Sequence, residues 1–281
     1  MDAPSLPRVM RSLRKNAGAV AGAAILAVFL VLAIGAPLVA PDDPEAQDLR
    51  NNFQPPGQGH VLGTDNLGRD IFSRILFGAR ISFLIGISSV AVGLVAGGTL
   101  GLVAGYCGGL TDSVIMRVMD VLLAFPGILL AIAIISILGP GVPNTMLAVG
   151  IFSIPTFARI IRASVLSIKV TEFVEAGRAL GASNLDLIWR HILPNCLSPV
   201  IVESTLRMGT SILTASGLSF LGLGVQPPSP EWGAMLSHAR GYLRNAPHLS
   251  IAPGMAITLV VLSLSLLGDG LRDALDPRLK E

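Results

Sequence analysis

The sequence predicts an all-α polytopic membrane protein that crosses the bilayer about six times. Hydrophobic residues make up 52% of the 281 residues and charged residues only 14%, against about 25% in soluble globular proteins. Several apolar runs reach the roughly 20 residues that a helix needs to cross the hydrocarbon core. A polar stretch, residues 171–195, separates two of these runs and keeps a helical pattern.

The first predicted span follows a short basic segment. Residues 1–16 carry this basic segment, and residues 17–40 are apolar and contain no charge. A secretory signal peptide is the alternative, but its apolar region would normally cover only about 7–15 residues, and cleavage after Ala40 would place Pro41 beside the cut. We therefore interpret residues 17–40 as an uncleaved first transmembrane helix.

Residues 41–80 are predicted to form an external loop that leads into an amphipathic helix. The first part is acidic and rich in Pro, Asn, Gln and Gly, which is typical of loops. From Asp65 an apolar stripe follows: Leu67, Ile71 and Ile75. Two acid–base pairs with four-residue spacing, Asp65/Arg69 and Asp70/Arg74, accompany it. This pattern favours a helix on the membrane surface, with a docking or gating element as the alternative.

Five further apolar segments lie in a transmembrane core over residues 81–270. They are residues 81–106, 114–138, 146–161, 197–223 and 249–267. Glycines recur at four-residue spacing in the first of them, which predicts close helix packing. Asp120 and Pro126 interrupt the second, and Pro155 predicts a kink in the third. We expect a tight turn at 139–143, a proline-rich external loop at 225–248, and a C-terminal segment at 271–281.

The polar stretch is predicted to form two short helices joined by a glycine elbow. Thr171 is a suitable N-cap for the first helix, and Gly181 lies where a C-cap is expected. Ser183 can cap the second helix, with an acidic residue three positions later. Because Pro194 disfavours helical dihedrals in the residue before it, this helix should end near Ile192.

This stretch resembles the EAA loop of ABC-importer permeases, in which Glu-Ala-Ala is followed by Gly and then by Leu-Pro. The matching residues are Glu175, Ala176, Gly181, Leu193 and Pro194, whereas Gly177 replaces the third motif residue and His191 takes the usual Ile position. HILPN at 191–195 is similar to the peptide/nickel branch of that superfamily. So are LGTDNLGRD at 62–70, LSFLGLGVQPPSPEWG at 218–233 and LLGDGLRDALDPR at 266–278. We call residues 171–195 the EAA segment.

The resemblance implies the type I importer permease fold and the role of a second (C-type) permease subunit. It implies a heterodimer with a homologous permease, two cytoplasmic ATPase subunits that hold ATP and Mg²⁺, and an external solute-binding protein. Residues 165–195 would be the cytoplasmic coupling loop, with Glu175 in the ATPase groove and Gly181 at the turn. Di- or oligopeptides are the implied substrates, and nickel chelates or glutathione are the alternatives.

The positive charges predict the orientation in the inner (plasma) membrane. With residues 1–16 inside, six predicted spans bring residues 271–281 back inside and place the EAA segment in the cytoplasm. Most Lys and Arg residues then lie inside. The outer loops hold Arg50, Arg69, Arg74, Arg80, Arg240 and Arg244.

Three charged residues lie within predicted spans. A lone charge at a helix centre costs roughly 2.5–3.5 kcal/mol, so Glu203 and Arg207, one turn apart, reduce this cost if they pair. They would face a polar passage or a partner subunit, or else snorkel and pair locally. Asp120 lies near the cytoplasmic end beside Arg117, where snorkelling is favoured.

Several kinds of chemistry are missing from the sequence. It contains no GxxxxGK[ST] phosphate loop and no recognisable nucleophile motif, so we expect this chain to be neither an enzyme nor a cofactor-binding protein. A net charge of +2 gives no support for nucleic-acid binding. His60, His191, His238 and His248 lack metal-ligand spacing, and Cys107 and Cys196 are interpreted as apolar fillers. A stand-alone secondary transporter or channel is the alternative of another class, but it gives no reason for a long helical polar loop.

Overall fold

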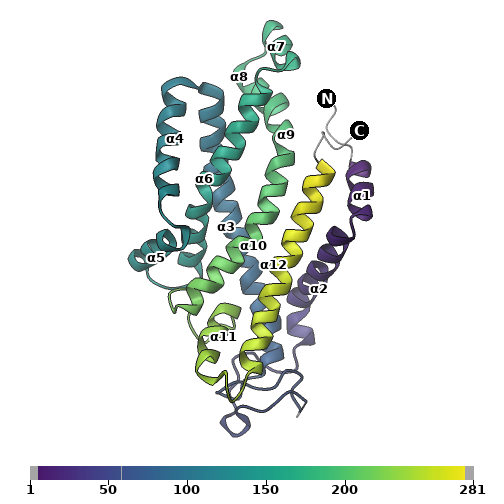
Figure 1. Ribbon diagram of the computed structural model, residues 1–281, viewed down its shortest axis with the longest axis vertical. Helices are drawn as coiled ribbons and strands as arrows, with labels where there is room; N and C mark the ends of the chain where they lie inside the picture. The colour runs from purple at the N-terminus through teal and green to yellow at the C-terminus, as the bar shows by residue number, and fades with distance from the viewer. Residues whose placement is uncertain (1–5, 58, 276–281) are drawn as a thin grey trace.

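The computed structural model describes residues 6–57 and 59–275 and confirms the predicted all-α fold (Figure 1). Within these residues no β-strand is present, and a single bridge joins Thr64 to Asp70. The long elements are α2 (Ala17–Val39), α3 (Ile71–Cys107), α4 (Gly109–Ala124), α5 (Gly127–Leu138), α6 (Val142–Ile168), α10 (Leu197–Phe220) and α12 (His248–Leu275). The short ones are α1 (Leu6–Lys15), η1 (Leu49–Asn51), α7 (Glu172–Ala179), α8 (Asn184–Asp186), the π-helical η2 (Leu187–Ile192), α9 (Leu193–Asn195), α11 (Trp232–Ala239) and η3 (Arg240–Tyr242).

Each of the six predicted spans corresponds to one helix or to one bent pair. In the described part of the chain, α2, α3, α6 and α12 are long and apolar enough to cross a membrane. The pair α4–α5 gives a fifth crossing if it is counted as one broken span. α10 has 24 residues and runs beside α6 and α12, but its two charges and many hydroxyl groups make it less apolar.

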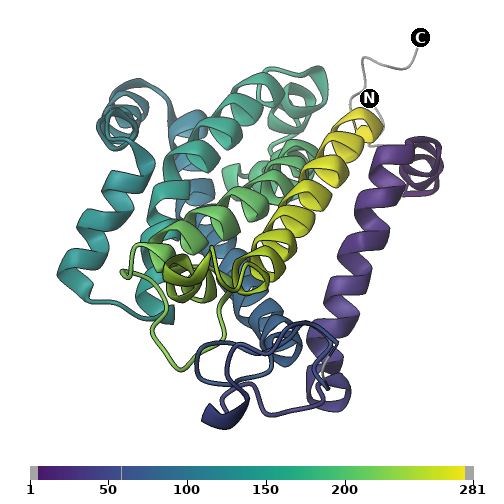
Figure 2. The same ribbon diagram turned by 60° about the horizontal axis from the view of Figure 1, so that its bottom comes forward.

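The molecule has two distinct ends in Figure 1. α7, α1 and the last turn of α12 lie at one end, which we call the α7 end. α11 and residues 40–70 lie at the other, the α11 end. Figure 2 shows α12 between α2 and α10, with α4 and α5 on the side of the molecule opposite α2. Residues 1–5 and 276–281 of the predicted terminal segments lie outside the described residues.

α3 packs on α6 through a row of glycines with four-residue spacing: Gly93, Gly97, Gly101 and Gly105. A Cβ at Gly97 would clash with the carbonyl oxygen of Ile154, and one at Gly101 with that of Ala158. The glycine spacing therefore marks a close approach of two helix backbones, as small residues allow in membrane proteins.

The predicted amphipathic surface helix from Asp65 is wrong. Residues 65–70 form a tight turn, and α3 begins only at Ile71, where the Asp70 carboxylate caps the helix by accepting the Ser73 N–H at 2.7 Å. α3 then continues without a break for 37 residues. Ile71 and Ile75, two residues of the predicted surface stripe, are buried against α2, α11 and α12.

The two predicted acid–base pairs in this region have different outcomes. Asp65 and Arg69 do form an ion pair, with 2.7 Å between Oδ2 and Nε, but it closes the turn instead of bracing a helix. Arg74 pairs with Asp65 at 3.8 Å and donates to the carbonyl of Pro44, so the predicted Asp70/Arg74 pair is absent. The Asp70 carboxylate does not pair with Arg74 because it accepts the Ser73 N–H and contacts His60 instead.

The third predicted span is broken into two helices that meet at 92°. Phe125 is extended, as expected for a residue before proline, and Pro126 precedes the first turn of α5. A Cβ at Gly127 would clash with the ring of Phe152 on α6. Pro126, which interrupts the apolar run in the sequence, therefore lies at a sharp bend between α4 and α5. Gly127 allows α5 to approach α6 closely.

The predicted external loop at 225–248 contains the buried helix α11. Glu231 caps it by accepting the Ala234 N–H at 2.8 Å, and Gly233 lies so close to the Ser216 backbone that a Cβ would clash. The indole of Trp232 is fully buried and donates to the carbonyl of Ile75 at 3.1 Å. This hydrogen bond fixes α11 against the first turns of α3.

Candidate functional site

The EAA segment forms a compact helical unit that projects at the α7 end (Figure 1). It consists of α7, α8, a π-helical segment over Leu187–Ile192, and α9. Val174, Leu187 and Ile192 are fully buried on its inner side. They pack in one cluster with residues of α6 and of the start of α10: Ile161, Val165, Cys196 and Val200.

This apolar cluster attaches the EAA segment to the ends of α6 and α10. Full burial of one large aliphatic side chain is worth roughly 1.5–3 kcal/mol. Three such side chains therefore hold the segment firmly. The segment is therefore packed onto the ends of α6 and α10 rather than being a loose loop.

The predicted glycine elbow is confirmed. Gly181 has φ +85°, in the left-handed region that favours glycine. Its N–H donates to the carbonyl of Arg178, and the next N–H, that of Ala182, donates to the carbonyl of Gly177. The Ser183 hydroxyl accepts the Asp186 N–H at 3.2 Å, which confirms the predicted cap of the second helix.

The predicted side-chain cap by Thr171 is not formed. Thr171 has the extended backbone of an N-cap residue, but its hydroxyl donates to the carbonyl of Ile168 at 2.6 Å and caps no N–H of α7. The side chain instead closes the turn that leaves α6. Thr171 therefore marks the boundary of the helix, as predicted, but by a different hydrogen bond.

The predicted helix end near Ile192 is wrong. The Leu193 N–H donates to the carbonyl of Ile188, five residues earlier, which is the π-helical pattern. Pro194 follows in the first turn of α9, where a missing N–H needs no partner. The wide turn accommodates the proline, and the chain stays helical until Cys196.

The motif residues Glu175 and Ala176 are exposed on α7. Within the described residues, Glu175 takes part in no ion pair and no side-chain hydrogen bond. Gly177 faces the second helix, and a Cβ there would lie 3.0 Å from Cδ2 of Leu187. Glycine in place of the motif's second alanine therefore makes room for the buried Leu187.

The remaining motif residues lie around the turn and the second helix. Gly181 and Pro194 are exposed, and Leu193 and His191 are half-buried. The His191 ring lies 6.2 Å from that of Phe173, centroid to centroid. The motif residues thus lie on several sides of the EAA segment rather than at one point.

Three large apolar side chains on the EAA segment were missed by the sequence reasoning. Leu180, Leu185 and Trp189 are 88%, 69% and 66% exposed. Trp189 lies in the π-helical segment, between the buried residues Leu187 and Ile192. A tryptophan inside a polar stretch is the signal that could have found them. All three belong to the segment that projects at the α7 end.

Two ion pairs join α4 to α6 near the α7 end. Asp112 accepts from Arg162 through both carboxylate oxygens, at 2.5 and 2.6 Å. Asp120 accepts from Arg159 at 2.6 Å. The half-exposed Asp120 carboxylate thus pairs with Arg159 on α6. Whether it also snorkels, as expected from the sequence, stays a prediction.

Glu203 and Arg207 form the predicted pair on α10, with 2.7 Å between Oε1 and Nε. Arg207 also donates to the hydroxyl of Thr156 on α6 at 2.8 Å, and its guanidinium lies 6.0 Å from the Phe152 ring. Both charged side chains are largely buried, at 18% and 23% exposed. The pair therefore links α10 to α6, and Glu203 also lines an open cavity with Arg272 and Leu275 of the last turn of α12.

Sequence comparison identifies two family models on this chain. Residues 97–281 match the model of binding-protein-dependent transport system inner membrane components. Residues 6–56 match the N-terminal transmembrane domain of oligopeptide transport permease C.

Two curated relatives match almost the whole chain. The glutathione transport system permease protein GsiD of Pectobacterium atrosepticum is 52% identical over 96% of this chain and 90% of the relative. The dipeptide transport system permease protein DppC of Alkalihalophilus pseudofirmus is 48% identical over 96% of this chain and 89% of the relative.

A solved structure shares the fold. An inward-facing structure of the MetNI methionine ABC transporter superposes with a TM-score of 0.59 over 72% of this chain and 96% of the matched chain, at 18% identity.

Proposed function

The chain belongs to the family of binding-protein-dependent transport system inner membrane components, and we propose that it forms half of the passage for small peptides in an ATP-driven importer. It is a multi-pass inner-membrane permease subunit of an ABC importer. Permeases of this family work with a second permease, ATPase subunits and a binding protein. We propose that here the second permease is a homologous chain and that two ATPase subunits hold ATP and Mg²⁺.

The exposed tip of the EAA segment carries the proposal. Leu180, Leu185 and Trp189 are exposed, while Val174 and Leu187 anchor the same unit to α6 and α10. An element that exposes three large apolar side chains and is fixed on its inner side is suited to insertion into a groove of a soluble subunit. Glu175 would contribute a polar contact beside this tip, and Gly181 keeps the turn tight.

The proposed orientation places the α7 end in the cytoplasm. Arg162, Lys169, Arg178 and Arg190 lie on the last turns of α6 or on the EAA segment, whereas acidic residues are frequent in the loop after α2. An excess of Lys and Arg on the cytoplasmic side is the general rule for membrane proteins. The EAA segment is then within reach of ATPase subunits, and the α11 end faces the binding protein.

The proposed mechanism is a rigid-body transfer of motion. Closure of the ATPase subunits moves the EAA segment, and its apolar anchor moves the ends of α6 and α10 with it. α6 and α10 are joined again by the bond from Arg207 to Thr156, so they tilt together. Their tilt switches access to the passage between the two sides of the membrane.

The substrate class follows from the two relatives. One is named for glutathione and the other for dipeptides, and both substrates are short peptides. We propose that this chain transports peptides of two or a few residues, with glutathione included. Nickel chelates remain the alternative substrate, and a transporter that acts alone remains the alternative mechanism.

Purification from native cells tests the proposal. The tagged chain should co-purify with ATPase subunits, and the double variant Leu180→Ala/Trp189→Ala should lose them while still inserting in the membrane. Leu38→Ala, which truncates a 92% exposed leucine in the last turn of α2, is the matched control and should keep them. Normal ATPase recovery with the double variant would reject the assigned docking tip. Uptake of labelled dipeptide by proteoliposomes that contain this chain alone would favour the stand-alone transporter.

A further inference from the structure

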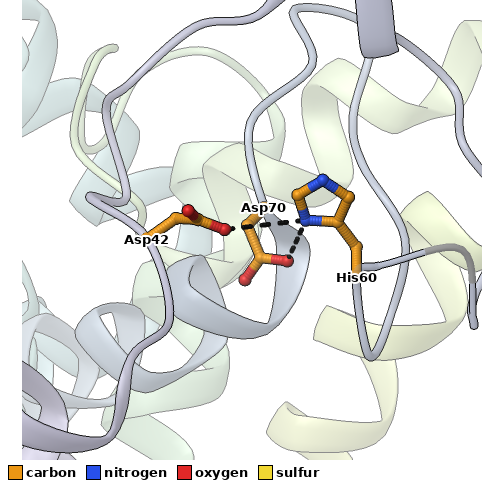
Figure 3. A group of neighbouring side chains, drawn as sticks. All are labelled: Asp42, His60 and Asp70. Atoms are coloured by element: carbon orange, nitrogen blue, oxygen red, sulfur yellow. Dashed lines mark hydrogen bonds and ion pairs between the residues drawn. The ribbon is translucent and has the colours of Figure 1, made fainter.

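Three side chains that are distant in the sequence meet at the α11 end (Figure 3). Asp42 follows α2, His60 lies in the loop, and Asp70 caps α3. Nδ1 of His60 lies 2.9 Å from Oδ1 of Asp70 and 3.6 Å from Oδ2 of Asp42. One nitrogen and two carboxylate oxygens therefore converge, and the three atoms lie within 4.8 Å of one another.

The positive charge that surrounds this cluster is too small for its two carboxylates. The Asp70 side chain is fully buried, and its Oδ2 accepts the Ser73 N–H, so Oδ1 is left with His60 as its partner. Nδ1 carries at most one proton, which can be donated to only one of the two carboxylates. No Lys or Arg in the described residues lies within 4 Å of either carboxylate. By contrast, the neighbouring Asp65 has both Arg69 and Arg74.

We propose that Asp42, His60 and Asp70 bind a divalent transition-metal ion, with Zn²⁺ as the best chemical match. Imidazole and carboxylate are ligands that Zn²⁺ accepts, and three protein ligands leave a fourth position for water. Neighbouring ligands around tetrahedral Zn²⁺ are about 3.3 Å apart when each bond is about 2.0–2.1 Å. The separations of 2.9 and 3.6 Å bracket this value.

Two further observations suit a metal site. The Ser73 N–H on Oδ2 of Asp70 fixes the carboxylate so that Oδ1 points at His60, the kind of support that orients metal ligands. Asp42 is half exposed and lines an open cavity of about 740 Å³, which also includes Asp43, Glu45 and Arg80. The cavity makes the Asp42 ligand accessible to a hydrated ion.

The proposed ion joins the end of α2 to the start of α3. These two helices are separated by a loop with little regular structure, apart from η1. A metal bound to ligands from both ends of that loop stabilises the folded state by mass action, because the unfolded chain does not hold the three ligands together. The inference does not depend on the transported substrate or on ATPase docking.

Zinc binding by the full chain in lipid nanodiscs tests the proposal. After chelator treatment and dialysis, ZnCl₂ should bind with one saturable site per chain, measured by equilibrium dialysis and elemental analysis. Asp42→Asn and His60→Gln should each raise the Kd for Zn²⁺ at least tenfold. Asp43→Asn, which changes the neighbouring carboxylate, and His248→Gln, which changes another histidine of this end, should leave the Kd unchanged.

At a ZnCl₂ concentration close to the wild-type Kd, Zn²⁺ should also raise the Tm of the wild type and of both controls by more than that of Asp42→Asn. The Asp42 variant is the informative one for folding, because its side chain is exposed and caps no helix, unlike that of Asp70. Absence of a saturable site in the wild type would overturn the proposal. So would an unchanged Kd in both ligand variants, because the ion would then be bound elsewhere.

Discussion

Tyr106 donates a hydrogen bond to Asn184 across 78 residues of sequence, with 2.6 Å between Oη and Oδ1. The bond joins the last turn of α3 to α8 within the EAA segment. α4, α5 and α6 separate α3 from this segment in the sequence. The other end of α3 packs on α11 through the hydrogen bond from Trp232 to Ile75. One helix therefore contacts the EAA segment at the α7 end and the buried Trp232 at the α11 end.

Loss of this hydrogen bond should weaken the attachment of the EAA segment to α3. For Tyr106→Phe we expect transport-stimulated ATP hydrolysis to fall about twofold, the effect of roughly 0.5 kcal/mol, the low end for one hydrogen bond. Hydrolysis by the reconstituted importer with peptide and binding protein is the measurement. Tyr242→Phe, which changes the only other tyrosine, is the control and should have no effect. Equal rates for Tyr106→Phe and wild type would show that this contact does not transmit force.

The turn at Gly181 should tolerate no side chain, for conformational reasons alone. No atom lies within 4 Å of a Cβ built there, but φ is +85°, and an L-residue in that region costs roughly 1–2 kcal/mol. Gly181→Ala should therefore increase proteolysis between α7 and α8 and lower coupled ATP hydrolysis. Gly241→Ala, which has equally open surroundings and no positive φ, should match the wild type. A stable, active Gly181→Ala protein would show that the turn relaxes without consequence.

The protein should be more stable when the charges of Glu203 and Arg207 are both present or both absent than when only one of them remains. Within the described residues, Glu203→Gln leaves the Arg207 guanidinium with Thr156 as its one side-chain hydrogen-bond partner. We expect a loss of about 1–3 kcal/mol in the free energy of unfolding. The double variant Glu203→Gln/Arg207→Gln should regain part of that loss, since no unpaired charge remains. Thermal unfolding in detergent measures both, and Glu172→Gln on exposed α7 is the control. Additive losses would mean that the two residues are not coupled.

Stability should depend on the titration of Glu231, which caps α11. Burial raises the pKa of this carboxyl group, although backbone N–H groups and serines oppose the rise. The folded state therefore favours the protonated form. The contribution of protonated Glu231 to stability is fully present below the pKa that this group has in the unfolded chain. It is lost as the pH rises through the higher pKa of the group in the folded state. Glu231→Gln is neutral at every pH, so its Tm should exceed that of the wild type increasingly as the pH rises from 4 to 8.

The control for this titration is Glu45→Gln, which changes an exposed glutamate and should leave the Tm–pH curve parallel to that of the wild type. A Tm difference between Glu231→Gln and wild type that stays constant with pH would exclude Glu231 as the titrating group.

Local sequence rules succeeded where one short-range interaction decides the structure. Gly181 and Ser183 were placed correctly, because a left-handed turn and a serine cap depend on a few neighbouring residues. The pair Glu203–Arg207 was also found, since residues four apart on a helix are adjacent. The same i,i+4 rule failed for Asp70 and Arg74, where the Asp70 carboxylate caps the start of α3 instead.

Hydropathy determined the membrane class and the six apolar segments, and short motifs such as HILPN at 191–195 carried the family resemblance. These properties are carried by residues close together in the chain. The tertiary structure alone decided which partners distant residues find: Asp120 with Arg159, Tyr106 with Asn184, and His60 with Asp42 and Asp70. It also decided that Leu187 is buried while Trp189, two positions away, is exposed. Burial and long-range pairing depend on how helices pack in three dimensions, and no local pattern encodes that packing.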